Sequence, residues 1–378
     1  MKISNSIASV RLHAVTVTPK TLWQFIEIKA ADGLTGFGEA TTMPEMSDLR
    51  EETASLAGRI LGRAADPSSL SDPLPGNKPG AAVRSAVDHA LWDIATQRTQ
   101  TPLAEGLGPL ERESIPVYAN INRRTVDRRQ EGFVASAKAA IADGHTRFKI
   151  APFDELSPEL EGDDLRTALD AGFARVSAVR EFVGPDLQLM VDCHWRCTAD
   201  SAEIVIHEAA RLGLYWVECP VAETIANVPL LARLRSLANA LGIRLAGCEE
   251  NIGLDGFSPF IDGGAYDVLM PDVKYAGGLA EFLKIAEASG RNGMEVSPHN
   301  PSGPISHLLS LNVCSVLPNL LMLEMQYDES PMFDALVNVA IPAITKGNSA
   351  SAVIAPGLGA KLALEAASGK VVTTEWSG

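Results

Sequence analysis

Between residues 115 and 326 the sequence repeats one pattern eight times: a short apolar run ends in a polar residue, and a helical pattern follows. The eight polar residues lie 23 to 43 positions apart and are Asn120, Lys149, Asp192, Glu218, Glu249, Asp272, His299 and Glu324. Continuous apolar runs are typical of parallel strands buried on both faces. Eight such βα units predict a closed barrel whose active site lies at the carboxyl ends of the strands, where all eight polar residues are expected.

The first hundred residues have a different hydrophobic pattern. Runs rich in Ile, Val and Leu occupy 7–17 and 22–30, and the second run stops at the turn dipeptide Asp32-Gly33. This pattern predicts an antiparallel sheet with a hairpin. Residues 80–98 repeat apolar positions at spacings of three and four, which predicts a helix.

Charge and composition exclude several classes of protein. The chain carries 47 Asp and Glu against 32 Lys and Arg, a formal charge of -15, so we expect neither nucleic acid nor an anionic membrane surface as a partner. It has no apolar run of about 20 residues and no apolar leader, which predicts a cytoplasmic protein. The five scattered cysteines are expected to be free thiols, mostly in the core.

Three of the strand ends carry carboxylates in succession: Asp192, Glu218 and Glu249. Convergence of three carboxylates above one barrel would produce repulsion that a hard divalent cation relieves, and Mg²⁺ fits such a site. Glu250 is a rival third ligand, but alternation along the strand favours Glu249.

The sixth and seventh strand ends supply a second group. Asp272 and His299 can lie side by side, and a carboxylate on one ring nitrogen makes the other a general base. His194 stands two residues after Asp192, so it is expected on the same side of its strand and facing the site. An isolated histidine would more often be a hydrogen-bonded loop residue, but the positions at barrel strand ends favour a catalytic role.

In their order, the motifs resemble the enolase superfamily, in its mandelate racemase subgroup. They are GLTGFGEA at 33–40, AAVRSAVDHALWDIA at 81–95, VDCHWR at 191–196, WVECP at 216–220, AGCEE at 246–250, PDVKYAGGL at 271–279, SPHNPSGP at 297–304 and APGLG at 355–359. The resemblance implies an α/β fold: a modified TIM barrel over 116–340 and an α+β capping domain formed by 1–115 and 341–378. It also implies an enzyme, since members of the superfamily abstract a proton α to a carboxylate and stabilise the enediolate with Mg²⁺.

Residue roles follow from the matching motifs. Asp192, Glu218 and Glu249 match the metal ligands, and Asp272 with His299 matches the catalytic dyad. Glu324, in LEMQ, matches the acid that hydrogen-bonds the carboxylate of a small-molecule substrate. Homo-oligomers are common in similar proteins, and we expect one here.

Two departures from the subgroup narrow the expected activity. The usual KxK becomes Lys149 and Ala151, so the second base is missing and racemisation is disfavoured unless Lys149 reaches the substrate. The D-x-H-x-R pattern around His194 is similar to galactonate dehydratase-type members, in which this histidine expels the 3-hydroxyl. With His299 taking the α-proton, the expected product is a 2-keto-3-deoxy sugar acid. The subgroup more commonly has a second Glu at the position of Cys219, and because of this further departure we do not name the sugar.

Other interpretations carry less weight. A racemase or epimerase is the main alternative, and a non-catalytic barrel that only binds a ligand is opposed by the metal carboxylates and both histidines. GFGEA resembles a phosphate loop, but neither a helix nor a lysine completes one. Asp88, His89, Trp92 and Asp93 are expected to pack rather than catalyse, while 18–23 and 41–46 could form loops that close over the substrate.

Overall fold

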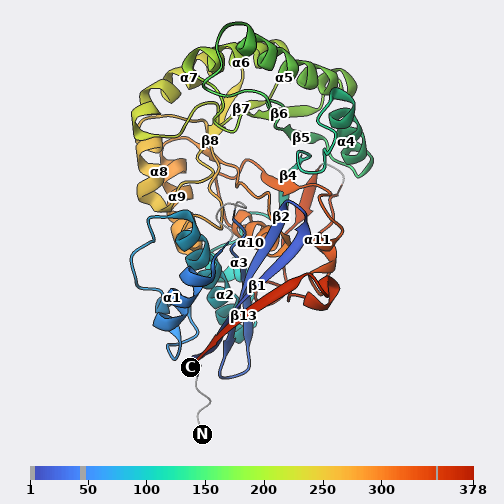
Figure 1. Ribbon diagram of the computed structural model, residues 1–378. Coiled ribbons are helices and arrows are strands. Elements are labelled where there is room, and N and C mark those ends of the chain that lie inside the picture. Colours follow the sequence, from blue (N-terminus) through green and yellow to red (C-terminus); the bar gives the residue numbers. More distant parts are fainter. Residues whose placement is uncertain (1–4, 43–47, 346–347) are drawn as a thin grey trace.

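The computed structural model describes residues 5–42, 48–345 and 348–378, which form a barrel and a strand-rich cap beside it (Figure 1). The cap contains an antiparallel sheet in the order β13-β1-β2-β3. Antiparallel pairing was predicted for β1, β2 and β3. Its strands are β1 (Ile7–Thr18), β2 (Thr21–Ala30), β3 (Thr35–Glu39) and β13 (Val371–Ser377). The accompanying helices are α1 (Arg50–Ile60), α2 (Lys78–Thr99) and α3 (Leu103–Leu107).

Close approach of α2 to β3 explains the glycines of GFGEA. A Cβ at Gly36 would lie 2.0 Å from the carbonyl oxygen of Ala90, and one at Gly38 would lie 2.0 Å from that of Ala86. Only glycine therefore permits this helix to pack on the strand. The hairpin before β3 turns at Gly33, whose φ of 93° also favours glycine.

Eight parallel strands form the barrel and follow one another around it in chain order, with β11 beside β4. They are β4 (Ser114–Asn120), β5 (Arg147–Ile150), β6 (Gln188–Asp192), β7 (Trp216–Glu218), β8 (Arg244–Gly247), β9 (Val268–Leu269), β10 (Glu295–Val296) and β11 (Leu323–Gln326). The barrel closes between β10 and the segment before β11, where Val296 N donates to Asn319 O at 2.9 Å and Leu321 N donates to Val296 O at 2.8 Å.

Helices cover the outside of this barrel (Figure 1). They are α4 (Gln130–Ala142), α5 (Gly162–Val183), α6 (Ala199–Arg211), α7 (Val228–Ala240), α8 (Gly253–Asp262), α9 (Leu279–Arg291) and α10 (Pro304–Cys314). The expectation of eight full βα units is wrong for the last unit, because β11 is followed by the four-residue helix α11 (Met332–Ala335). The remaining strand, β12 (Ser349–Ser351), pairs antiparallel with β4.

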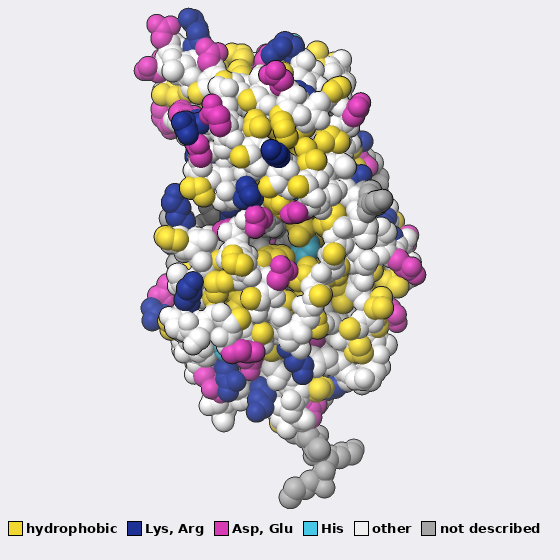
Figure 2. Space-filling model, turned by 90° about the vertical axis from the view of Figure 1, so that its right-hand side faces the viewer, with side chains coloured by type: hydrophobic (Ala, Val, Ile, Leu, Met, Phe, Trp, Pro, Cys, Tyr) yellow, Lys and Arg dark blue, Asp and Glu magenta, His cyan; other side chains and the backbone are white. Residues whose placement is uncertain are grey.

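Apolar side chains fill the barrel and the layer between its strands and helices. Inside it, Tyr118 contacts Trp216 edge to face, with ring centroids 5.4 Å apart. All five cysteines are free and buried, as predicted. Among the described residues, no helix is both long and apolar enough to cross a membrane. On the face drawn in Figure 2, acidic and basic side chains are interspersed.

Candidate active site

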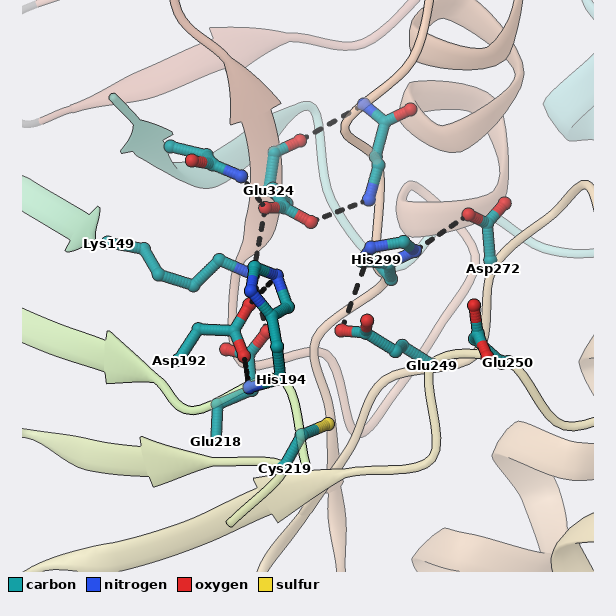
Figure 3. A network of polar contacts seen from close by, with 12 residues as sticks. Lys149, Asp192, His194, Glu218, Cys219, Glu249, Glu250, Asp272, His299 and Glu324 are labelled. Atoms are coloured by element: carbon teal, nitrogen blue, oxygen red, sulfur yellow. Dashed lines mark hydrogen bonds and ion pairs between the residues drawn. The ribbon is translucent and has the colours of Figure 1, made fainter. Parts of the chain in front are cut away.

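Three carboxylates converge at the carboxyl ends of β6, β7 and β8 (Figure 3). Asp192 and Glu218 end neighbouring strands and are paired in register, while Glu249 follows the last residue of β8 by two positions. One oxygen from each residue lies within 4.8 Å of the others, and all three residues are buried. The indole N–H of Trp216 donates to Glu218 Oε2 at 2.9 Å, which fixes that carboxylate from inside the barrel.

The electrostatics of these carboxylates fit a divalent cation. Burial raises the pKa of Glu218 to about 8 and that of Glu249 well above its usual range. For Asp192 burial acts in the same direction, but the neighbouring His194 and Lys149 outweigh it and the pKa is lowered. Glu249 Oε2 is buried without a hydrogen bond. Buried oxygens that lack enough positive charge suit a hard metal ion, which prefers carboxylate ligands.

Glu250 lies outside this cluster. Its carboxylate forms an ion pair with Lys78, at the start of α2 in the cap. The two adjacent side chains thus point to different places: Glu249 is directed into the barrel mouth, and Glu250 is held by the cap.

Lys149 does reach into the site. Its ammonium is buried and lies 2.5 Å from Glu218 Oε1, 2.9 Å from Glu324 Oε1 and 4.0 Å from Asp192. Burial alone would lower the pKa of Lys149, but the glutamates outweigh it and raise the pKa well above its usual range, which favours the charged form. Contrary to the picture of polar residues ending each run, Lys149 lies inside β5 and Glu324 inside β11.

A histidine and a carboxylate face each other across the ends of β9 and β10 (Figure 3). His299 Nδ1 lies 2.8 Å from Asp272 Oδ2, and each residue follows its strand's last residue by three positions. Lys274, which sequence reasoning missed, donates from Nζ to Asp272 Oδ2 at 2.7 Å and from its backbone N to Oδ1 at 2.8 Å. The signal that could have found it is its position two residues after Asp272 in the motif PDVKYAGGL.

His194 also faces the site, for a different reason from the one expected. β6 ends at Asp192, and the left-handed backbone of His194 (φ 46°) and Trp195 (φ 58°), rather than strand alternation, turns the imidazole inward. His194 Nε2 lies 2.9 Å from Asp192 Oδ2, while its side chain remains 40% exposed. Attraction to the Asp192 carboxylate raises the pKa of His194.

Glu324 is held by two amide groups, one from the end of β4 and one from the loop after β10. Its Oε1 accepts from Asn120 Nδ2 at 2.7 Å, and its Oε2 accepts from the backbone N of Asn300 at 2.8 Å. Asn300 was not predicted, although it directly follows His299 in the sequence. Together these contacts place Glu324 beside Lys149 and connect it to the loop that carries His299.

The cap contacts this region through several predicted segments. Asp88 accepts from the backbone N of Leu279 at 2.7 Å, and Asp93 accepts from that of Leu358 at 2.8 Å, so both acids hold neighbouring segments, as expected. Segment 18–23 includes the tight turn between β1 and β2. Of the other predicted loop, 41–46, residues 43–46 lie outside the described residues.

An eight-stranded barrel with buried carboxylates at the carboxyl ends of its strands is the arrangement of a barrel enzyme. Two family models agree: the mandelate racemase / muconate lactonizing enzyme N-terminal domain matches residues 4–108, and the enolase C-terminal domain-like family matches residues 132–367. The chain belongs to the mandelate racemase / muconate lactonizing enzyme family of the enolase superfamily, as its motifs indicated.

Curated relatives carry dehydratase names. The chain is 29% identical over 323 residues to the D-gluconate dehydratase of Thermoproteus tenax, a match that covers 82% of this chain and 62% of the relative. It is 28% identical over 371 residues to the D-galactonate dehydratase of Xanthomonas euvesicatoria, covering 93% and 91%.

Solved structures show the same fold. A mandelate racemase/muconate lactonizing enzyme from Jannaschia sp. CCS1 superposes with a TM-score of 0.83 at 23% identity, covering 99% of this chain and 98% of that one. An enolase protein from the Sargasso Sea environmental genome sequencing gives 0.80 at 28% identity, covering 99% of each chain.

Proposed function

We propose that this enzyme is a Mg²⁺-dependent acid-sugar dehydratase that removes the proton α to a carboxylate and the 3-hydroxyl, giving a 2-keto-3-deoxy sugar acid. The observation that carries the proposal is the placement of two histidines around one carboxylate cluster: His299 is 3.6 Å from Glu249, and His194 is 2.9 Å from Asp192. The names of the relatives, D-gluconate and D-galactonate dehydratase, support this reaction and substrate class.

Asp192, Glu218 and Glu249 would hold the metal ion, which when bound would stabilise the negative charge that develops on the substrate carboxylate. His299 would act as the base. Its Nδ1 faces Asp272, so with the proton on that nitrogen the other, Nε2, keeps its lone pair for the α-proton.

His194 would act on the leaving group. It donates a proton to the 3-hydroxyl, the C–O bond breaks, and the hydroxyl departs as water. The resulting enol then tautomerises to the 2-keto acid, so the overall reaction is loss of one water molecule.

Glu324 is proposed as the acid that hydrogen-bonds the substrate carboxylate. Burial acts to raise the pKa of Glu324, but Lys149 and His299 outweigh it and the pKa is lowered. An anionic substrate beside this carboxyl would act in the opposite direction and favour the protonated, donating form. Lys149 would add a positive charge on the same side of the site, 2.9 Å from Glu324.

Racemisation or epimerisation is the second candidate, because Lys149 does lie in the site. Two observations weigh against it: the Lys149 ammonium lies 2.9 Å from Glu324, a carboxylate outside the proposed metal ligands that favours the charged lysine, and the second position of the motif is the buried Ala151.

The test is a panel of aldonic and aldaric acids incubated with Mg²⁺ in deuterium oxide, with 2-keto acid and α-deuterium measured together. We expect 2-keto acid from at least one aldonic or aldaric acid. His194→Asn should lose water elimination but keep α-exchange through His299. His207→Asn, which changes an exposed histidine of α6, is the control and should keep both.

Two outcomes would contradict the proposal. Deuterium exchange without 2-keto acid across the whole panel would favour the epimerase instead. Unimpaired dehydration by His194→Asn would remove this histidine from the mechanism and leave protonation of the hydroxyl to another group.

A further inference from the structure

One carboxylate outside the cluster lies directly behind two of the proposed metal ligands. Glu223 is in the loop after β7, and its Oε1 accepts from the backbone N of Cys248 at 2.6 Å and from the hydroxyl of Tyr266 at 2.7 Å. The thiol of Cys219 lies 3.8 Å from the same oxygen. Cys219 directly follows Glu218, and Cys248 directly precedes Glu249.

Both cysteines have left-handed backbones. The φ of Cys219 is 44° and that of Cys248 is 69°, conformations that residues with a side chain rarely adopt and that persist only when the surroundings hold them. These two residues set the direction in which the chain leaves or enters each ligand. A group that holds them therefore also determines where Glu218 and Glu249 point.

The sequence provides space for this carboxylate at Gly247, the last residue of β8. A Cβ on Gly247 would lie 2.5 Å from Glu223 Oε1 and 2.4 Å from Tyr266 Cζ. Any larger residue would push the carboxylate and the ring away from Cys248.

We propose that Glu223 is a positioning residue of the metal site: it holds the left-handed turns at Cys219 and Cys248 and thereby keeps Glu218 and Glu249 aimed at a common point. The inference rests on the proposed metal-binding role of these two glutamates. Glu223 acts through the backbone and does not touch the ion. It belongs with the groups that orient ligands, whose loss commonly weakens metal binding 10- to 100-fold.

The experiment is a titration of the metal-free protein with Mn²⁺, with free ion measured by electron paramagnetic resonance, and no substrate present. We expect Glu223→Ala to weaken binding about 10- to 100-fold. Glu223→Gln keeps an oxygen that accepts from Cys248 N, so it should restore most of the affinity and lose about threefold, because a charge-assisted hydrogen bond becomes a neutral one. Excess Mg²⁺ should recover turnover in both variants.

Asp267 offers a matched control at the other end of the same strand. It accepts from the backbone N of Leu245, the second residue of β8, at 2.9 Å and from Arg235 Nε at 2.6 Å. Asp267→Ala removes a comparable carboxylate-to-backbone contact far from the site. It should lower the thermal midpoint while leaving Mn²⁺ affinity unchanged.

The outcomes separate this inference from the proposed function. If the unaltered enzyme binds no Mn²⁺ or Mg²⁺, the metal site itself is overturned. If it binds but Glu223→Ala binds equally well, or Asp267→Ala weakens binding to the same extent, the role of Glu223 is overturned. If Glu223→Ala does not fold, Glu223→Gln decides, and an affinity equal to that of the unaltered enzyme overturns the inference.

Discussion

The two halves of the site are built differently. In the metal half, Asp192 and Glu218 are the last residues of β6 and β7 and are paired in register, so the hydrogen-bonded ladder of the barrel places them. In the base half, β9 and β10 have two residues each, and Asp272 and His299 lie three residues beyond them. Loops rather than strands therefore place the dyad, and loops need side chains to hold them.

The base half obtains those side chains from its own motif and from the cap. Lys274 donates to Asp272 and to Ser302, and both lysine and aspartate are buried. Glu39, at the end of β3 in the cap, accepts from the backbone N–H of Gly303 at 2.7 Å and of Ser306 at 2.9 Å, at the start of α10. Two of the three carboxylates in the metal half are thus placed by barrel strands, with Glu249 in the loop after β8, whereas the base half joins barrel to cap.

Removing a metal ligand should have the largest effect. Glu249→Gln is expected to abolish tight Mg²⁺ binding and turnover together, because only two carboxylates remain to bind the ion. Calorimetric titration and a 2-keto acid assay would measure both. Glu250→Gln is the control and should bind Mg²⁺ normally, since Glu250 pairs with Lys78; the reverse result would exchange the two assignments.

Removing the proposed base should impair catalysis without impairing metal binding. His299→Asn is expected to lower turnover by about 10² to 10⁴ and to stop α-proton exchange, while Mg²⁺ affinity stays within a few-fold of the unaltered enzyme. Exchange into deuterium oxide followed by NMR provides the measurement. Retained exchange at the normal rate would move the base elsewhere, with Lys149 as the first candidate.

The two buried lysines should respond differently to metal. Leaving a buried carboxylate without its partner typically costs about 3–5 kcal/mol of unfolding free energy. Lys274→Met should show such a loss with or without Mg²⁺. The loss in Lys149→Met should shrink in Mg²⁺, because the ion neutralises the carboxylates that Lys149 otherwise pairs with. Urea unfolding with and without Mg²⁺ tests this, and equal responses of both variants would contradict the division of the site.

A smaller effect is expected on acidification, from a histidine behind the base half. Burial lowers the pKa of His307, on α10, to about 4, below the value of about 6.5 in an unfolded chain. Its stabilising contribution is complete above pH 6.5 and is lost as the pH falls through 4, with a slope of about 1.4 kcal/mol per pH unit in that window. Urea unfolding of the unaltered enzyme and His307→Gln should differ by this slope; parallel curves would contradict it.

The carboxylate cluster could be predicted from the sequence more completely than the surroundings of Asp272 and His299. Asp192, Glu218 and Glu249 could be found because a strand ending in a carboxylate leaves a pattern in the sequence. The contacts of Lys274 and Asn300 could not be predicted, because they depend on loop conformations that no periodicity encodes. The same limit explains His194, whose inward direction comes from a left-handed backbone and not from strand alternation.

The capping sheet pairs an early segment of the chain with a late one, so it is completed only late in synthesis. Strand β13 pairs with β1, and the contact between Arg11 and Glu375 joins residues 364 positions apart. At about 5–20 residues per second, a ribosome needs roughly 20–70 s to make the chain between them. Throughout that time the edge of β1 that later pairs with β13 has no partner strand, while the whole barrel is synthesised. The nascent cap is therefore exposed to pairing with other strands until the last segment arrives, and chaperone dependence should concentrate on this early sheet.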